Sequence, residues 1–216
     1  MTDKKKLILG VVLFGSVWGG LEAMVTSSMA GVGTFIPRSV VLAFVSLLVL
    51  CYARFLMPRM GSTLAIGLIA AGFKFLGLPT LFMCQLAGVV GQAIVLEIFF
   101  TLAQNRGWLH KALPMVGVLI AASYVNSLSF SFSQAYLFQN PWWLDRGASG
   151  CLEWSVIIGS QAALASLHGF ALALLLSKVS LVRFERFIEA RQAAFTGSAV
   201  AISACCWVAG ALLIRT

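Results

Sequence analysis

Two charged residues stand inside apolar segments of this chain. Glu22 lies in the apolar run from Leu7 to Val25, and Lys74 lies in the segment GLIAAGFKFLGLP. An ionised side chain inside a membrane costs about 2.5 kcal/mol or more, so such residues are usually paired and often functional. We therefore expect Glu22 and Lys74 to form a buried ion pair. The pair either belongs to a binding site or only fixes how two helices pack.

Other polar residues are expected at the level of this pair. At a rise of about 1.5 Å per residue along the predicted spans, Gln85 and Asn126 lie at about the height of Glu22 and Lys74, in the outer leaflet. Four helices then contribute polar groups to one layer, which predicts a binding pocket. Cys84 precedes Gln85. It is either a small packing residue or a ligand for a soft metal centre, such as the cobalt of a corrinoid.

The elements that position these residues are predicted to be membrane-spanning helices. Of the 216 residues, 60% are hydrophobic and 10% are charged, whereas soluble domains carry about 25% charged residues. Apolar runs of about 20 residues, each long enough to cross a hydrocarbon core of about 30 Å, recur along the chain. We expect an all-α transmembrane bundle of six or seven helices, forming one integral membrane domain over residues 1–216. The predicted spans are 7–27, 37–53, 62–78, 80–103, 112–130, 152–177 and 194–213.

The distribution of lysine and arginine predicts the orientation. Cytoplasmic loops of membrane proteins carry an excess of these residues. The predicted spans place most of them on one side of the membrane, so we expect a multi-pass protein of the bacterial inner (plasma) membrane with a cytoplasmic N-terminus. The net charge of +8 then reflects topology and not a nucleic-acid partner. The residues on the predicted cytoplasmic side are Lys4, Lys5, Lys6, Arg54, Arg59, Arg106, Lys111, Lys178, Arg183, Arg186 and Arg191, and those on the other side are Arg38, Arg146 and Arg215.

Two connecting segments are longer than the rest. Residues 129–150, SFSFSQAYLFQNPWWLDRGASG, form an external loop in this interpretation. Its tryptophans, Trp142 and Trp143, either belong to an interfacial aromatic belt or close an outward-facing pocket as a lid. Residues 178–192 carry apolar side chains on one helical face and mostly charged ones on the other. This pattern predicts a cytoplasmic helix that lies on the membrane surface or against a partner.

The sequence supports none of the enzyme motifs considered. The segment GASG, residues 147–150, resembles the serine motif of rhomboid proteases, but Ser149 and His168 belong to one predicted helix and would lie nearly 30 Å apart, at about 1.5 Å per residue. The chain contains no Walker A sequence, dinucleotide-binding fingerprint or HExxH motif. It is therefore not expected to hydrolyse ATP itself.

The small bundle, its glycine- and alanine-lined first helix and the long segment before the sixth span resemble the S components of energy-coupling factor transporters. The resemblance covers about residues 7–178 and implies a protein that captures a vitamin-like or metal-containing cofactor, cobalamin being one candidate, from outside. Family members have six helices with both ends inside, and pair with a transmembrane coupling subunit and two ATPases, although some work alone. The feature matching the family's contact for the coupling subunit is the stripe Gly15, Gly19 and Ala23. The span 194–213 is additional to the family pattern.

The resemblance makes the polar layer a substrate-binding pocket. The expected substrate-binding residues are Glu22, Lys74, Cys84, Gln85, Asn126, Trp142 and Trp143, with Cys84 as a metal ligand only if the substrate carries a soft metal. Two other functions stay open. In the first, the chain is a non-catalytic subunit of a larger membrane complex. In the second, it is a membrane enzyme that modifies a lipid or its bound cofactor through Cys84.

Overall fold

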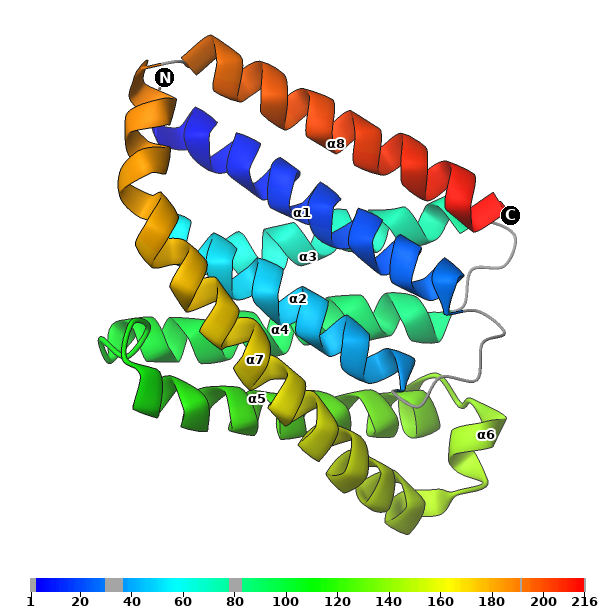
Figure 1. Ribbon diagram of the computed structural model, residues 1–216. Coiled ribbons are helices and arrows are strands. Elements are labelled where there is room, and N and C mark those ends of the chain that lie inside the picture. The colour runs from blue at the N-terminus through cyan, green and yellow to red at the C-terminus, as the bar shows by residue number, and fades with distance from the viewer. Residues whose placement is uncertain (1–2, 30–36, 78–82, 191, 216) are drawn as a thin grey trace.

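The computed structural model describes residues 3–29, 37–77, 83–190 and 192–215, and these residues form helices and no strand. The helices are α1 (Asp3–Ser28), α2 (Arg38–Leu56), α3 (Ser62–Gly72) with the 3₁₀ helix η1 (Phe73–Gly77), α4 (Met83–Asn105), α5 (Ala112–Phe132) with the π-helix η2 (Ser133–Leu137), α6 (Pro141–Leu144), α7 (Gly147–Ala190) and α8 (Gln192–Arg215) (Figure 1). The predicted all-α class is confirmed.

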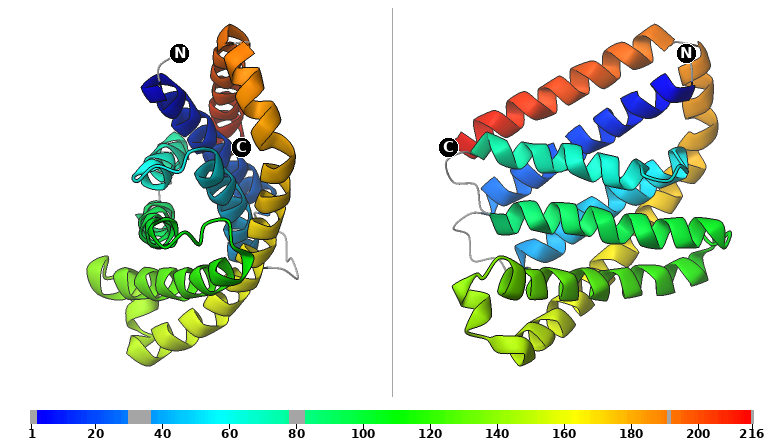
Figure 2. Two further views of the ribbon diagram at one scale, coloured as in Figure 1. Left: turned by 90° about the vertical axis from the view of Figure 1, so that its left-hand side faces the viewer. Right: turned by 180° about the vertical axis from the view of Figure 1, so that it is seen from behind.

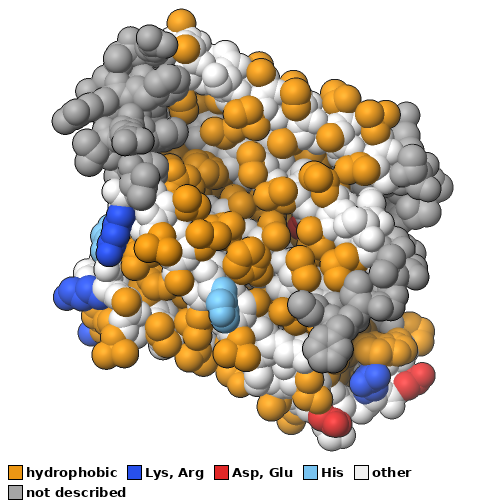
Figure 3. All heavy atoms as spheres, in the orientation of Figure 1, with side chains coloured by type: hydrophobic (Ala, Val, Ile, Leu, Met, Phe, Trp, Pro, Cys, Tyr) orange, Lys and Arg blue, Asp and Glu red, His pale blue; other side chains and the backbone are white. Residues whose placement is uncertain are grey.

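The long helices have the length and composition of membrane spans. In the described residues, α1, α2, α4, α5, α7 and α8 each contain an apolar stretch long enough to cross a bilayer. Hydrophobic side chains spread over the face seen in Figure 3, and charged ones lie at its edges. The chain is thus a polytopic membrane bundle. The shorter α3 and η1 together extend about 26 Å, at about 1.5 Å per α-helical and 2.0 Å per 3₁₀ residue.

Six of the helices close into a ring. Going round it, α1 packs on α3, α3 on α4, α4 on α5, α5 on α7, α7 on α2 and α2 again on α1. α8 lies outside the ring, along α1 and η1 (Figures 1 and 2). The apolar core fills the ring with large buried side chains such as Trp18, Leu50, Phe100 and Leu119. The extra seventh span is therefore peripheral to a six-helix bundle.

The ends of the bundle agree with the predicted grouping of positive charge. In Figure 1 the N-terminus and the connections α2–α3, α4–α5 and α7–α8 lie at the left, and α6 and the C-terminus lie at the right. The left end therefore carries the described basic residues of that group, among them Lys4, Arg59, Arg106 and Lys111. That this side is the cytoplasm stays a prediction.

The segment 129–150 is helical and not the long loop that we expected. α5 continues through η2 to Leu137, and α7 begins at Gly147, five residues before the predicted span. Between them, Asn140 caps the short α6: its Oδ1 atom accepts a hydrogen bond from the backbone N–H of Trp142 (3.1 Å). Pro141 follows at the first position, where a missing N–H is harmless. Local capping thus replaces the predicted loop with a helical turn.

The predicted cytoplasmic helix 178–192 is largely a continuation of α7. α7 has 44 residues, so it extends about 66 Å at about 1.5 Å per residue. This is about twice the thickness of a hydrocarbon core. The side chains of residues 179–192 lie outside the described part of the structure, so the amphipathic face that we expected there stays a prediction.

Close packing of α7 on α2 depends on Gly169. A Cβ atom at this position would lie 2.9 Å from the carbonyl oxygen of Phe44 and 3.1 Å from the backbone nitrogen of Leu48. Both atoms belong to the backbone and cannot turn aside. Small residues permit such close helix contacts in membranes.

Changing Gly169→Ala should therefore lower the melting temperature of the detergent-purified protein. Overpacking of this kind typically costs about 1–3 kcal/mol. Gly117→Ala in α5 is the matched control, because a Cβ atom there meets nothing within 4 Å and alanine favours helix. Equal melting temperatures for the two variants in a thermal-shift assay would contradict the role assigned to Gly169.

Candidate ligand-binding site

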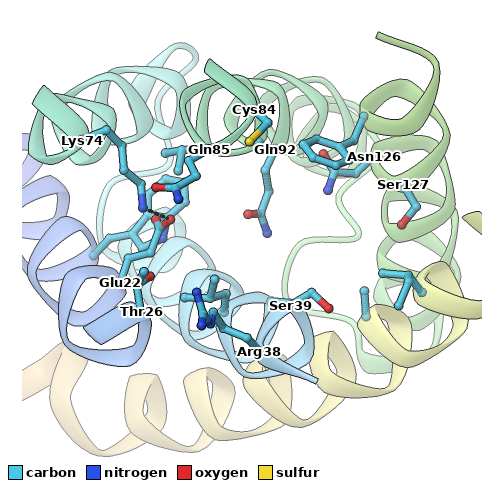
Figure 4. A pocket seen from close by; sticks show the side chains of 18 of the residues that line it. Glu22, Thr26, Arg38, Ser39, Lys74, Cys84, Gln85, Gln92, Asn126 and Ser127 are labelled. Carbon is cyan, nitrogen blue, oxygen red and sulfur yellow. Dashed lines mark ion pairs between the residues drawn. The ribbon is translucent and has the colours of Figure 1, made fainter. Parts of the chain in front are cut away.

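A cavity of about 270 Å³ lies within the helix ring, toward the end that carries α6. The residues lining it come from α1, α2, η1, α4, α5 and α7, so every member of the ring except α3 proper contributes (Figure 4). Five of the seven predicted site residues line it. The lining residues are Trp18, Glu22, Thr26, Arg38, Ser39, Leu42, Ala43, Lys74, Cys84, Gln85, Gly88, Val89, Gln92, Asn126, Ser127, Phe130, Trp154, Ile158 and Ala162.

The predicted ion pair is present at the wall of this cavity. The Nζ atom of Lys74 lies 2.6 Å from Oε1 of Glu22, and both side chains are buried. Glu22 projects from α1, and Lys74 projects from η1, where the chain has left α-helical winding (Figure 4). Each charge neutralises the other, as the membrane interior requires. The pair therefore joins α1 to η1 and presents charged groups to the cavity.

Three side-chain amides face the same space from two helices. Gln85 and Gln92 belong to α4 and Asn126 to α5 (Figure 4). Gln92 donates a hydrogen bond from Nε2 to Oγ of Ser46 (2.7 Å). Within the described part of the chain, the amides of Gln85 and Asn126 have no hydrogen-bond partner. A side-chain amide can both donate to a ligand and accept from it.

Cys84 also lines the cavity, with a free and half-buried thiol. No group of three His, Cys, Asp or Glu side chains that could hold a metal ion occurs among the residues that the structure describes. Cys84 would therefore be a single thiol ligand to a metal that the substrate itself carries.

Trp142 and Trp143 do not line the cavity. The indole of Trp143 is buried, at 6% exposure, and packs on Trp154 and Phe130 with ring centroids 4.8 and 5.9 Å apart. Those two rings do line the cavity. Trp142 is 52% exposed, and the guanidinium of Arg146 lies 3.9 Å from its ring centroid. The tryptophans therefore do not close the cavity as the predicted lid. The helical turn of α6 directs Trp143 toward α7, where it packs against residues of the cavity wall.

Sequence analysis missed Arg38 as a lining residue. We assigned this arginine to the external side as part of the charge distribution, whereas the structure places it at the start of α2 in the cavity wall. The available signal was an arginine on a side that otherwise carries few positive charges. Trp18, Thr26 and Trp154 were also missed, because apolar and hydroxyl residues occur on every face of a membrane helix.

A second ion pair lies at the opposite end of the bundle. Nη1 of Arg54 is 3.2 Å from Oε1 of Glu97, and Arg54 is 1% exposed. The Glu97 carboxylate also accepts hydrogen bonds from the backbone N–H groups of Gly61 (2.8 Å) and Thr63 (2.9 Å) at the start of α3. Arg54, which we read as a loop residue, is therefore a buried partner of Glu97.

The small-residue stripe of α1 is occupied by the chain itself. A Cβ atom at Gly15 would lie 2.6 Å from Cβ of Ile69 in α3, and one at Gly19 would clash with the ring of Phe73 in η1. Ala23, the third residue of the stripe, is buried. In this conformation the stripe does not offer a free surface to a coupling subunit.

α8 covers a neighbouring part of α1. Trp207 donates a hydrogen bond from Nε1 to Oγ of Ser16 (3.2 Å) and packs on Phe73 with ring centroids 4.1 Å apart. A Cβ atom at Gly20 would lie 3.1 Å from Cβ of Cys206. Cys206 thus packs against α1, while its neighbour Cys205 is exposed. The additional span therefore supports η1, and with it the position of Lys74.

The ion pair between Glu22 and Lys74 should be energetically coupled. Glu22→Leu and Lys74→Met each leave one buried charge without its partner, which costs about 3–5 kcal/mol. The double variant leaves no charge and should lose much less stability than the sum of the two single losses. Denaturation of the three variants in detergent measures this difference; losses that simply add would show that the two residues do not stabilise one another.

Comparison with protein-family models, with curated proteins and with solved structures found no match to this chain. Its relation to S components therefore depends on the resemblance of the sequence alone.

Proposed function

We propose that this protein is a membrane transport protein that captures a small polar ligand from the external side and mediates its uptake. The observation that carries this proposal is the cavity within the helix ring, toward the end opposite the N-terminus. Polar groups from five helical elements converge there inside an otherwise apolar bundle. Ionisable and amide side chains in such a place usually mark a substrate site.

The resemblance to S components is compatible with this architecture. A ring of six helices surrounds the cavity, and α8 packs outside it. In this proposal the N-terminus is cytoplasmic, and partners of the kind that S components use, a transmembrane coupling subunit and ATPases, supply the energy. Because the stripe of Gly15 and Gly19 is packed against Ile69 and Phe73, such a partner would bind elsewhere or displace these contacts.

The volume of the cavity limits the size of the ligand that it can hold. Pockets for drug-sized molecules enclose about 300–1,000 Å³, and this cavity of about 270 Å³ lies just below that range. A compact vitamin-like molecule suits this space, whereas a corrinoid such as cobalamin would need a much wider site. The role of Cys84 as a ligand for cobalt is accordingly not part of the proposal.

The proposal predicts that the protein, gently purified from its host membranes, carries a bound small molecule detectable by native mass spectrometry. Gln85→Leu should reduce its occupancy, because loss of a buried hydrogen bond costs about 1–3 kcal/mol, or about five- to 150-fold in affinity. Gln104→Leu is the matched control: it lies on the same helix at the opposite end, where its amide donates to the carbonyl oxygen of Pro58 (2.8 Å).

Two results would contradict capture of a ligand at this site. One is a bundle without a small molecule that is accompanied by stoichiometric membrane subunits, which would favour the structural role. The other is equal occupancy in Gln85→Leu and Gln104→Leu. Melting temperatures of both variants establish that they are folded.

A further inference from the structure

The described wall of the cavity carries one more positive charge than negative charge. Its charged residues are Glu22, Lys74 and Arg38. Glu22 neutralises Lys74 through the contact of 2.6 Å. Arg38, which is half-buried, is then a cation that has no counter-charge among the described lining residues.

Among the residues that the structure describes, no carboxylate pairs with Arg38. Its Nη2 atom donates a hydrogen bond to the carbonyl oxygen of Met29 (3.1 Å), which is neutral. Among the described residues Arg38 forms no ion pair. The connections 30–36 and 78–82, which join helices at the same end of the bundle, contain no Asp or Glu. The missing negative charge therefore does not come from these parts of the chain.

An arginine placed in this way matches one kind of ligand group. Its planar guanidinium presents five N–H donors and remains charged at every physiological pH. Two parallel N–H donors fit the two oxygens of a carboxylate or of a phosphate. Figure 4 shows the Arg38 side chain reaching from the start of α2 into the cavity, toward the α1 side.

We propose that the ligand of this cavity carries an anionic group bound by Arg38. This proposal rests on the proposed function. A carboxylate, with a single negative charge, matches the net charge of the cavity better than a doubly charged phosphate.

The neutral lining residues indicate what the rest of the ligand is like. Gln85, Gln92 and Asn126 supply amides that recognise neutral polar groups such as carbonyl oxygens and ring nitrogens. The rings of Phe130 and Trp154 also line the cavity and suit a flat ring. The ligand class is thus a compact, ring-bearing monoanion.

Matched probes test the charge requirement. Benzoate and benzamide have nearly the same shape and differ in charge, and phenyl phosphate replaces the carboxylate by a phosphate. We expect benzoate to raise the melting temperature of the detergent-purified, ligand-depleted protein more than either of the others. Arg38→Gln should weaken benzoate binding by about tenfold or more, since hydrogen bonds to charged groups are the stronger ones. Arg38→Lys should retain part of it.

Arg59→Gln is the control, because Arg59 is an exposed arginine at the other end of the bundle and should leave benzoate binding unchanged. Two results would overturn the assignment of an anionic ligand. One is equal binding of benzamide and benzoate, and the other is benzoate binding that is unchanged in Arg38→Gln. A response to phenyl phosphate that exceeds the response to benzoate, and that Arg38→Gln abolishes, would keep the anionic group and exclude the carboxylate.

The two proposals fail in different ways. A neutral or cationic molecule found bound by native mass spectrometry would overturn the anionic ligand and leave ligand capture intact. Absence of any bound molecule, together with no response to the three probes, would overturn both.

Discussion

A buried charge inside a bilayer needs a partner, and in the described part of the chain two ion pairs at different depths provide one. Glu22 and Lys74 join α1 to η1 at the cavity, and Arg54 and Glu97 join α2 to α4 at the other end. The Glu97 carboxylate also accepts hydrogen bonds from the first N–H groups of α3. The short third span is thus fixed at both ends by charged groups of its neighbours, although its own apolar length is modest.

The cavity follows from this arrangement. Within the ring, α4 and α5 contribute buried apolar side chains such as Phe100 and Leu119 to the core. Toward the α6 end, the wall changes to amides, hydroxyls and the ion pair. Trp143 packs against Phe130 and Trp154, two rings of the wall, on the side away from the cavity. Rigid packing around a polar space is what a selective site needs, because its polar groups are already held in place before a ligand enters.

Much of this was predictable from the sequence, and the failures have identifiable causes. Hydropathy located every span, and residue counting placed Glu22 and Lys74 at one height, because the rise of a helix is constant. Rotation about the helix axis and the choice of neighbour are not encoded in hydropathy. Arg54 at a span end was therefore read as a topological charge although it is buried, and Arg38 was not recognised in the cavity wall. We expected a loop where Asn140 caps the helical turn of α6. This turn places Trp143 against the cavity wall and not in the cavity.

The 3₁₀ winding of η1 sets the direction in which Lys74 points. A 3₁₀ helix turns about 120° per residue and an α-helix about 100°, so each residue that changes winding rotates those beyond it by about 20°. Phe73, the first residue of η1, lies directly under Trp207 of α8. If Phe73 rewound as α-helix, Lys74 would turn by about 20° about the axis relative to Glu22. The peripheral helix α8, which packs on Phe73 through Trp207, thus helps to fix the direction of the buried charge of Lys74.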